Sequence, residues 1–218
     1  MIISRDRSYV FVHIPKTGGT SLAAALEARA MKDDLLIGDT PKARKRKSRL
    51  KGLQTRGRLW KHATLTDIDG LLTPEEIGQM FAFTLVRNPW DRVISYYHWL
   101  QDQEFDHPAV MLSKSLPFEE FLAAPLIQGS LQHSPASSYM RDATGAEHCS
   151  LYIRLEAFEK DAAPLMDHLG FQLSLPHLNP SRRVVDYRAC YDARTRQIVA
   201  KLCAEDIARF GYRFDPDE

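Results

Sequence analysis

The residues best suited to chemistry lie in a glycine-containing loop near the start of this 218-residue chain. An apolar run, Tyr9–Ile14, precedes the loop and an alanine- and leucine-rich stretch of helical spacing follows it, so the loop joins a strand to a helix. Glycines let the backbone approach an anion, and Thr20 or Ser21 can cap the helix, whose first N–H groups favour negative charge. The sequence therefore predicts a loop that holds a phosphate or sulfate ester.

The position of Lys16 separates this loop from the common loop for nucleoside triphosphates. That motif places its lysine after the glycines, whereas Lys16 comes before Gly18 and Gly19. An ordinary strand-to-helix turn with a solvated lysine is the alternative that this segment leaves open by itself. A second motif is needed to decide between the two interpretations.

A second apolar run leads into an arginine and another helix. Phe81–Val86 has the composition of a buried strand, and Pro89 suits the first turn of a helix. Arg87 therefore follows the carboxyl end of a strand, which is the edge where ligands bind in open α/β sheets. Ser95 comes eight residues after Arg87, so the two side chains can converge on one phosphate. The alternative is an ion pair between Arg87 and Asp91, with Ser95 capping within its own helix.

Together the two motifs resemble those of the sulfotransferases that use 3′-phosphoadenosine 5′-phosphosulfate (PAPS) as the sulfuryl donor. The stretch His13–Ser21 is similar to that family's loop for the 5′-phosphosulfate, particularly in the carbohydrate-directed, heparan sulfate 2-O-sulfotransferase-like branch. Arg87 and Ser95 are similar to its site for the 3′-phosphate. Weaker similarity continues through Leu151–Phe158 and Pro176–Ser181, so the resemblance covers most of the chain.

The resemblance implies a donor site. Lys16 would stabilise the departing phosphate oxygen, and backbone N–H groups of Thr17–Ser21 would hold the 5′-phosphate. Arg182 and Arg183 lie in a late loop, where the family often closes over the nucleotide. No metal is expected, because a sulfuryl group carries less negative charge than a phosphoryl group. The predicted donor-binding residues are Lys16, Thr17, Gly18, Gly19, Thr20, Ser21, Arg87, Ser95, Arg182 and Arg183.

His62 is the predicted general base, and a purely structural histidine is the alternative. Histidine titrates near neutrality, and His62 lies between the two donor motifs, where the carbohydrate-directed branch places a histidine base. Nearby positive charge would lower its pKa and keep it neutral. His133 is the second candidate, since the family has a histidine-containing loop that meets the acceptor near here. Ser134 replaces the aromatic residue that often follows that histidine.

A strongly basic segment precedes His62. Its mutual repulsion predicts an exposed, mobile insertion at about 41–62 unless a polyanion neutralises it. Solvated surface, contact with an anionic acceptor or donor, and nucleic-acid binding are the alternatives, and nucleic acid is disfavoured because Trp60 is the segment's one stacking residue. The segment has no acidic residue, and its basic residues are Lys42, Arg44, Lys45, Arg46, Lys47, Arg49, Lys51, Arg56, Arg58 and Lys61.

Alternating strands and helices predict an α/β, P-loop-like three-layer fold with a central parallel sheet flanked by helices. The predicted strands are Tyr9–Ile14, Met80–Val86 and Ser150–Arg154. The predicted helices are Thr20–Met31, Trp90–Gln101, Phe118–Ala123, Ala157–Leu169 and Thr195–Phe210. Polar loops at Asp102–Leu116 and Leu126–Thr144 would form the acceptor side. Length and a hydrophobic content of 44% predict one sulfotransferase domain, 1–218.

The predicted function is a PAPS-dependent sulfotransferase. It would move a sulfuryl group by in-line displacement to a hydroxyl of a carbohydrate or other polar acceptor, including an anionic glycan. A nucleotide-dependent phosphotransferase and a non-catalytic polyanion-binding protein are the alternatives. No run approaches the roughly 20 apolar residues of a membrane-spanning helix. Cys149, Cys190 and Cys203 lack metal-ligand spacing, so reduced thiols and a cytoplasmic location are expected.

Overall fold

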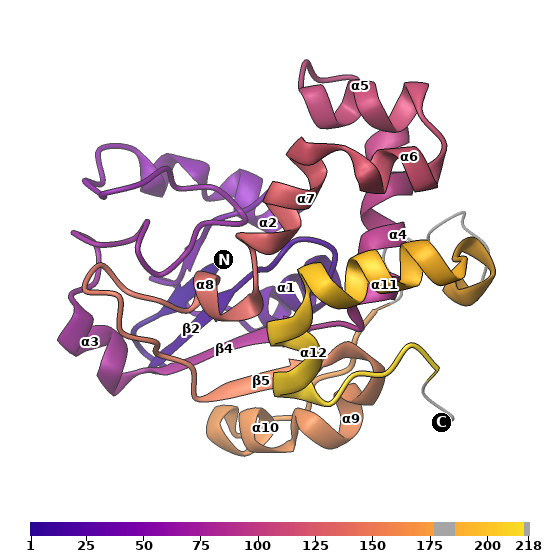
Figure 1. The fold of residues 1–218 in the computed structure, drawn as a ribbon. Helices are drawn as coiled ribbons and strands as arrows, with labels where there is room; N and C mark the ends of the chain where they lie inside the picture. The colour runs from indigo at the N-terminus through magenta and orange to yellow at the C-terminus, as the bar shows by residue number, and fades with distance from the viewer. Residues whose placement is uncertain (177–185, 216–218) are drawn as a thin grey trace. The chain divides into compact units, whose positions relative to one another are not determined.

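The computed structural model describes residues 1–176 and 186–215 (Figure 1). The chain divides into two compact units. The first comprises Met1–Val86 with Ala136–Asn179, and the second comprises Arg87–Pro135 with Pro180–Glu218. Among the described residues, the first unit contains the β-sheet and the second unit is helical.

The first unit is built on a five-stranded sheet with the order β3-β1-β2-β4-β5. β2 (Tyr9–Val12), β4 (Phe81–Val86) and β5 (Leu151–Arg154) run parallel, which confirms the predicted centre of the fold. β1 (Ile2–Ser4) and β3 (Leu35–Leu36) add an antiparallel edge. That edge is absent from the prediction because strands of two or three residues are too short to show an alternating pattern.

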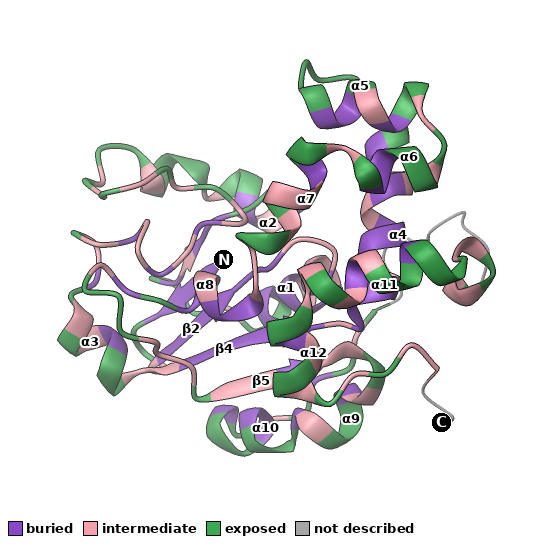
Figure 2. Ribbon diagram, viewed as in Figure 1, coloured by how far each residue is buried: buried purple, intermediate pink, exposed green. Residues whose placement is uncertain are grey.

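Helices and loops cover both faces of this sheet. One face packs against α1 (Gly19–Ala28), α9 (Phe158–Asp161) and α10 (Ala163–Leu169). The other packs against α3 (Pro74–Gln79), α8 (Ala136–Tyr139) and the loop that precedes α3. Figure 2 shows β2 and most of β4 buried between these layers. The layers confirm the predicted arrangement of a sheet between helices.

The basic segment contains α2 (Pro41–Lys45) and a 3-10 turn, η1 (Lys47–Leu50), where the sequence predicts a mobile insertion. The Thr40 hydroxyl caps α2 by accepting from the Ala43 N–H at 3.2 Å. Charge repulsion is offset because several cations of the segment donate to main-chain carbonyls outside it: Lys42, Arg46, Arg49 and Arg56.

The second unit packs its helices around an aromatic and aliphatic core. Tyr97, on the long helix of this unit, lies with its ring centroid 5.0 Å from Phe121 and 5.3 Å from Phe118. Tyr191 packs edge to face on Phe118, with centroids 5.1 Å apart. The helices are α4 (Pro89–Gln101), α5 (Pro108–Ser115), α6 (Phe118–Ala123), α7 (Pro125–Gln132), α11 (Ala193–Leu202) and α12 (Ala204–Phe210), with the 3-10 turn η3 (Tyr187–Cys190).

The two predicted acceptor loops are wrong as loops. α5 occupies much of Asp102–Leu116, while α7 and α8 occupy much of Leu126–Thr144. Each of α5 and α7 begins with a proline, and His107 Nδ1 caps α5 by accepting from the Ala109 N–H at 3.1 Å. The polar composition of these stretches reflects the exposed faces of short helices.

Two predicted helices are interrupted. Ala157–Leu169 divides into α9 and α10 at Ala162, and Thr195–Phe210 divides into α11 and α12 at Cys203. Within residues 1–176 and 186–215, no helix combines the length and apolar character that spanning a membrane requires.

Candidate active site

The sheet brings the two sequence motifs to one edge. β2 and β4 are parallel neighbours in the register Val12 to Thr84, so both strands end at the same edge of the sheet. The glycine-containing loop leaves β2 there, and Arg87 is the next residue after Val86, the last residue of β4. This is the edge at which parallel α/β sheets bind ligands.

The loop after β2 turns at two residues with left-handed backbone conformation. Lys16 has a φ of 66° and Gly18 a φ of 84°. Glycine adopts this conformation readily, whereas for Lys16 it costs about 1–2 kcal/mol. Backbone turned in this way directs neighbouring N–H groups toward one point, where an anion can bind. The strain at Lys16 is a sign that its position in the loop matters to function.

α1 begins at Gly19, with Gly18 as its N-cap. The prediction that Thr20 or Ser21 caps this helix is wrong, since both residues lie inside its first turn and no side chain caps it. The Ser21 N–H donates to the Gly18 carbonyl at 3.0 Å, which leaves the hydroxyl as the Ser21 group suited to a donor phosphate. The first turn contains no acidic residue, so the positive end of the helix dipole is uncompensated there.

His13 and Thr17 brace this loop from inside. The Thr17 hydroxyl donates to the Ile14 carbonyl at 2.9 Å, so its side chain supports the turn. A Cβ added to Gly19 would lie 2.1 Å from His13 Cδ2, which shows how closely the His13 ring packs under the first turn of α1. Burial, followed by nearby positive groups, holds the pKa of His13 well below its usual value. His13 is therefore a neutral packing residue.

His62 is tied to the residue that enters the loop. Its Nδ1 lies 2.7 Å from the His13 carbonyl oxygen, and the two imidazole centroids are 4.6 Å apart. Because a carbonyl oxygen can only accept, Nδ1 carries the proton and donates it to this bond. The lone pair then lies on Nε2 of His62. This is the tautomer that a general base requires.

The pKa of His62 is lowered to about 4. Burial is the largest cause, the hydrogen bond to His13 opposes it, and the charge of Lys61 adds to the lowering. The expected direction is thus confirmed, but burial outweighs the positive charge on which the expectation depended. At neutral pH the side chain is uncharged, and an anionic donor bound nearby would raise its pKa.

A short turn holds His62 in place. The Ala63 N–H donates to the Trp60 carbonyl at 3.0 Å, and Ala63 is completely buried. Lys61 pairs with Asp39 at 2.8 Å, which fixes the turn to the other end of the basic segment. The sequence offers no signal for Asp39 as a supporting residue, because 22 positions separate it from Lys61.

Arg87 makes the ion pair that the sequence leaves open as an alternative. Its Nε lies 2.7 Å from Asp91 Oδ2, and Nη2 lies 2.6 Å from the same oxygen. A guanidinium has five N–H donors, so a carboxylate on one edge is compatible with a phosphate on another. Ser95 is buried within α4, which is capped by Asn88 instead. The 3′-phosphate role of Arg87 and Ser95 stays a prediction.

The remaining predicted site residues are His133, Arg182 and Arg183. His133 is exposed at the end of α7, where its Nδ1 donates to the Gly129 carbonyl at 2.7 Å. Arg182 and Arg183 lie outside the described residues. In the described part of the chain, no group of three or more His, Cys, Asp or Glu side chains could hold a metal ion. The absence of a metal requirement stays a prediction.

Sequence comparison identifies the family. The pattern of the sulfotransferase family matches residues 1–213. The chain belongs to the sulfotransferase family. This assignment confirms the predicted enzyme class, a PAPS-dependent sulfotransferase. The sequence matches none of the curated proteins.

Among solved structures, this sulfotransferase is similar to mouse sulfotransferase SULT7A1, which was crystallised in complex with PAP. The TM-score is 0.45 and the sequence identity is 15%, with 94% of this chain and 86% of the mouse chain covered.

Proposed function

We propose that this sulfotransferase moves the sulfuryl group of PAPS to a hydroxyl of a carbohydrate or other polar acceptor, in the manner of the heparan sulfate 2-O-sulfotransferase-like branch. His62 is the general base, and Lys16 stabilises the leaving group. The observation that carries this proposal is the 2.7 Å bond from His62 Nδ1 to the His13 carbonyl. Through that bond, His62 keeps a free lone pair on Nε2 and is held next to His13, the residue that leads into the donor loop.

The donor loop fits an anion in two respects. Lys16 and Gly18 have the left-handed conformation that turns backbone N–H groups toward an anion, and the helix that follows begins without an acidic side chain. We assign the 5′-phosphate to the N–H groups of Thr17, Gly18, Gly19 and Thr20 and to the Ser21 hydroxyl. Arg87 and Ser95 would bind the 3′-phosphate, and Arg182 and Arg183 would contact the nucleotide.

His62 and Lys16 have complementary tasks. PAPS supplies the sulfuryl group and a phosphate that can depart. As the acceptor oxygen bonds to sulfur, His62 Nε2 takes the hydroxyl proton, and the bond from Nδ1 to His13 stabilises the resulting imidazolium. The Lys16 ammonium offsets the charge that develops on the departing phosphate oxygen. Together these residues leave a sulfate ester on the acceptor and a proton on His62.

We further propose that residues 1–218 act as one sulfotransferase domain in the cytoplasm, without a metal. Cys149, Cys190 and Cys203 are free thiols, which supports the reducing compartment predicted from their spacing. His133 is kept as the acceptor-contacting residue and the second candidate for the base.

Calorimetric titration with the product nucleotide, 3′-phosphoadenosine 5′-phosphate (PAP), tests the donor assignment. 5′-AMP is the control, because it lacks the 3′-phosphate. We expect PAP to bind at least about tenfold more tightly, which corresponds to ~1.4 kcal/mol. Equal affinity for the two nucleotides would remove the role given to Arg87 and Ser95. Transfer from labelled PAPS to a panel of sugar hydroxyls then tests the acceptor class, and label appearing only on non-sugar acceptors would contradict it.

A further inference from the structure

Trp60 presents an exposed aromatic ring next to the proposed base. Its side chain is 44% exposed, although a ring of this size usually gains by burial. The centroids of Trp60 and His62 lie 5.1 Å apart with ring planes at 86°, so the two rings meet edge to face. The turn that ends at Ala63 holds both residues. An exposed indole is therefore fixed beside the group that would deprotonate the acceptor.

A cation accompanies this ring. The guanidinium carbon of Arg58 lies over the Trp60 ring, 6.0 Å from its centroid, and Arg58 is exposed to solvent. The Trp60 indole and the Arg58 guanidinium are close enough to contact an apolar part and an anionic part of the same ligand. The axial C–H groups of a pyranose pack against an indole face, and a carboxylate or sulfate on the same sugar pairs with a guanidinium.

The segment that contains this pair is basic. The ion pair between Asp39 and Lys61 closes the basic segment, so the segment starts and ends beside the turn that holds His62. No acidic residue lies between Pro41 and His62 in the sequence. Two carboxylates lie against the segment: Asp39 pairs with Lys61, and Asp67 accepts from the Thr64 N–H at 2.8 Å. The segment's exposed cations, besides Arg58, include Arg44, Lys45, Lys47 and Lys51.

We propose that Trp60 and Arg58 form the acceptor subsite of this enzyme, and that its ligand is an acidic pyranose within an anionic glycan. The inference rests on the proposed function, because it takes His62 as the base. Trp60 would receive the sugar ring, and Arg58 would bind its carboxylate or sulfate. The exposed cations of the basic segment would contact neighbouring sugars of the same chain.

A glycan fits these features better than a nucleic acid does. Single-stranded nucleic acids are held by several aromatic residues on which successive bases stack, and Trp60 is the one such ring in the segment. One ring next to a base suits a single sugar that must present one hydroxyl to His62 Nε2.

Binding without donor tests the subsite independently of catalysis. The probes are a panel of hexasaccharides bearing uronate carboxylates or sulfates, neutral maltohexaose, and a six-nucleotide oligothymidylate, titrated into the whole protein. We expect at least one acidic hexasaccharide to bind and to protect the fluorescence of Trp60 from quenching by acrylamide. Its affinity should fall as the salt concentration increases. Maltohexaose and the oligonucleotide should bind at least about tenfold more weakly.

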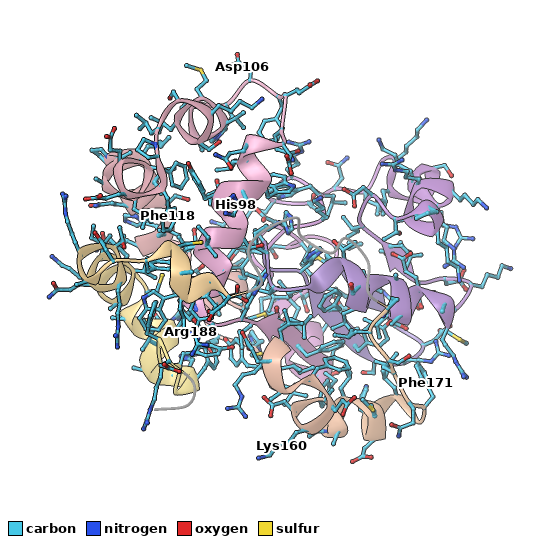
Figure 3. All side chains as sticks on the ribbon, turned by 90° about the vertical axis from the view of Figure 1, so that its right-hand side faces the viewer. His98, Asp106, Phe118, Lys160, Phe171 and Arg188 are labelled. Carbon is cyan, nitrogen blue, oxygen red and sulfur yellow. The ribbon has the colours of Figure 1, made fainter. Side chains whose placement is uncertain are left out.

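Matched variants separate the subsite from general effects. Trp60→Ala should lower the affinity for the acidic glycan at least about tenfold. Trp60→Phe should lower it about threefold or less, and Arg58→Gln about threefold to tenfold. Phe105→Ala removes an exposed ring elsewhere, 48% exposed, and should change nothing. Lys160→Gln removes an exposed cation on α9 of the first unit, where Figure 3 shows the side chain pointing away from the ribbon, and should also change nothing.

PAP titration distinguishes failure of the subsite from failure of the proposed function. Two outcomes overturn the subsite and leave the donor site intact. In the first, the protein binds PAP normally but binds no acidic glycan. In the second, it binds PAP normally and Trp60→Ala binds the acidic glycan as tightly as the natural protein does. Tighter binding of the oligonucleotide or of maltohexaose also overturns it. Glycan binding that depends on Trp60 in a protein that does not bind PAP overturns the proposed function and leaves the subsite.

Discussion

The ring of His13 fills the space that a side chain on Gly19 would need, since a Cβ on Gly19 would meet His13 Cδ2 at 2.1 Å. The same His13 offers its carbonyl oxygen to His62 Nδ1 at 2.7 Å. His13 therefore links the first turn of α1 to the proposed base. A substitution at His13, Gly19 or His62 should therefore disturb the packing of the other two residues.

Gly19→Ala should damage both donor binding and catalysis. The new methyl group would displace the His13 ring and with it the carbonyl that holds His62, and overpacking of this kind typically costs about 1–3 kcal/mol. Thermal unfolding and PAP titration measure the two effects. Gly129→Ala is the matched control, because a Cβ there meets no atom within 4 Å. An unchanged melting temperature and PAP affinity in Gly19→Ala would contradict the packing argument.

His62→Ala should lower kcat by about 10²- to 10⁴-fold while PAP affinity stays unchanged, because a general base acts on the acceptor proton. His133→Ala should retain most of kcat. Transfer from labelled PAPS and calorimetric titration with PAP separate the two effects. If His133→Ala abolished transfer while His62→Ala did not, the base assignment would move to His133.

The acid limb of kcat/KM should lie near the lowered pKa of His62, about 4, instead of near 6.5. The base must be neutral, so activity is lost as the pH falls through that value. The acid limb of kcat should lie higher, because bound PAPS favours the imidazolium. Initial rates across pH, with and without saturating donor, measure both limbs. Coincident limbs near 6.5 would mean that burial does not control this histidine.

Stability has its own pH dependence at His62. Because the folded pKa, about 4, lies below the usual value of 6.5, the unfolded chain binds more protons between these values. The free energy of unfolding therefore rises with pH in this window, and the contribution is lost as the pH falls through it. Denaturant titrations at pH 4.5 and 6.5 should show a smaller change for His62→Gln than for the natural chain. An equal change in both proteins would rule out His62 as a contributor.

Lys16→Ala and Lys16→Gly should both abolish transfer, since each removes the ammonium group. They should differ in stability, because glycine accepts the φ of 66° and alanine does not. We expect the glycine variant to be about 1 kcal/mol more stable than the alanine variant. Denaturant unfolding measures the difference, and equal stabilities would show that residue 16 is not strained.

Asp91→Asn should weaken PAP binding several-fold and leave 5′-AMP binding unchanged. The variant removes the charge that holds the Arg87 guanidinium at 2.7 Å, so the arginine loses its fixed orientation toward the 3′-phosphate. Parallel calorimetric titrations with the two nucleotides provide the test. Equal weakening of both would indicate a general disturbance of α4.

Local pattern was sufficient to predict the loop that joins β2 to α1 and the parallel centre of the sheet. The strand that ends near Val12, the glycines of the loop and the strand before Arg87 are features of neighbouring residues, which periodicity and turn chemistry describe well. The start of α1 was misjudged by one residue, because Gly18 took the capping position that hydroxyl side chains usually occupy.

Long-range contacts could not be predicted from one sequence. His62 meets His13 across 49 positions, and Lys61 meets Asp39 across a segment whose composition suggested mobility. The ordering of that segment depends on cations donating to carbonyls such as those of Glu27 and Met31, which no local pattern reveals. The same limit applies to Trp60, whose place beside His62 depends on the turn that they share.

The ion pair between Asp39 and Lys61 closes the basic segment into a loop, with its two ends held together at 2.8 Å. The buried Ala43 and the cations that donate to carbonyls outside the segment fix parts of this loop, so a change of length is tolerated best among its exposed residues. The entropic cost of a longer closed loop grows only slowly with length. Insertions or deletions among those exposed residues should therefore change the surface beside His62 while they cost little free energy of unfolding.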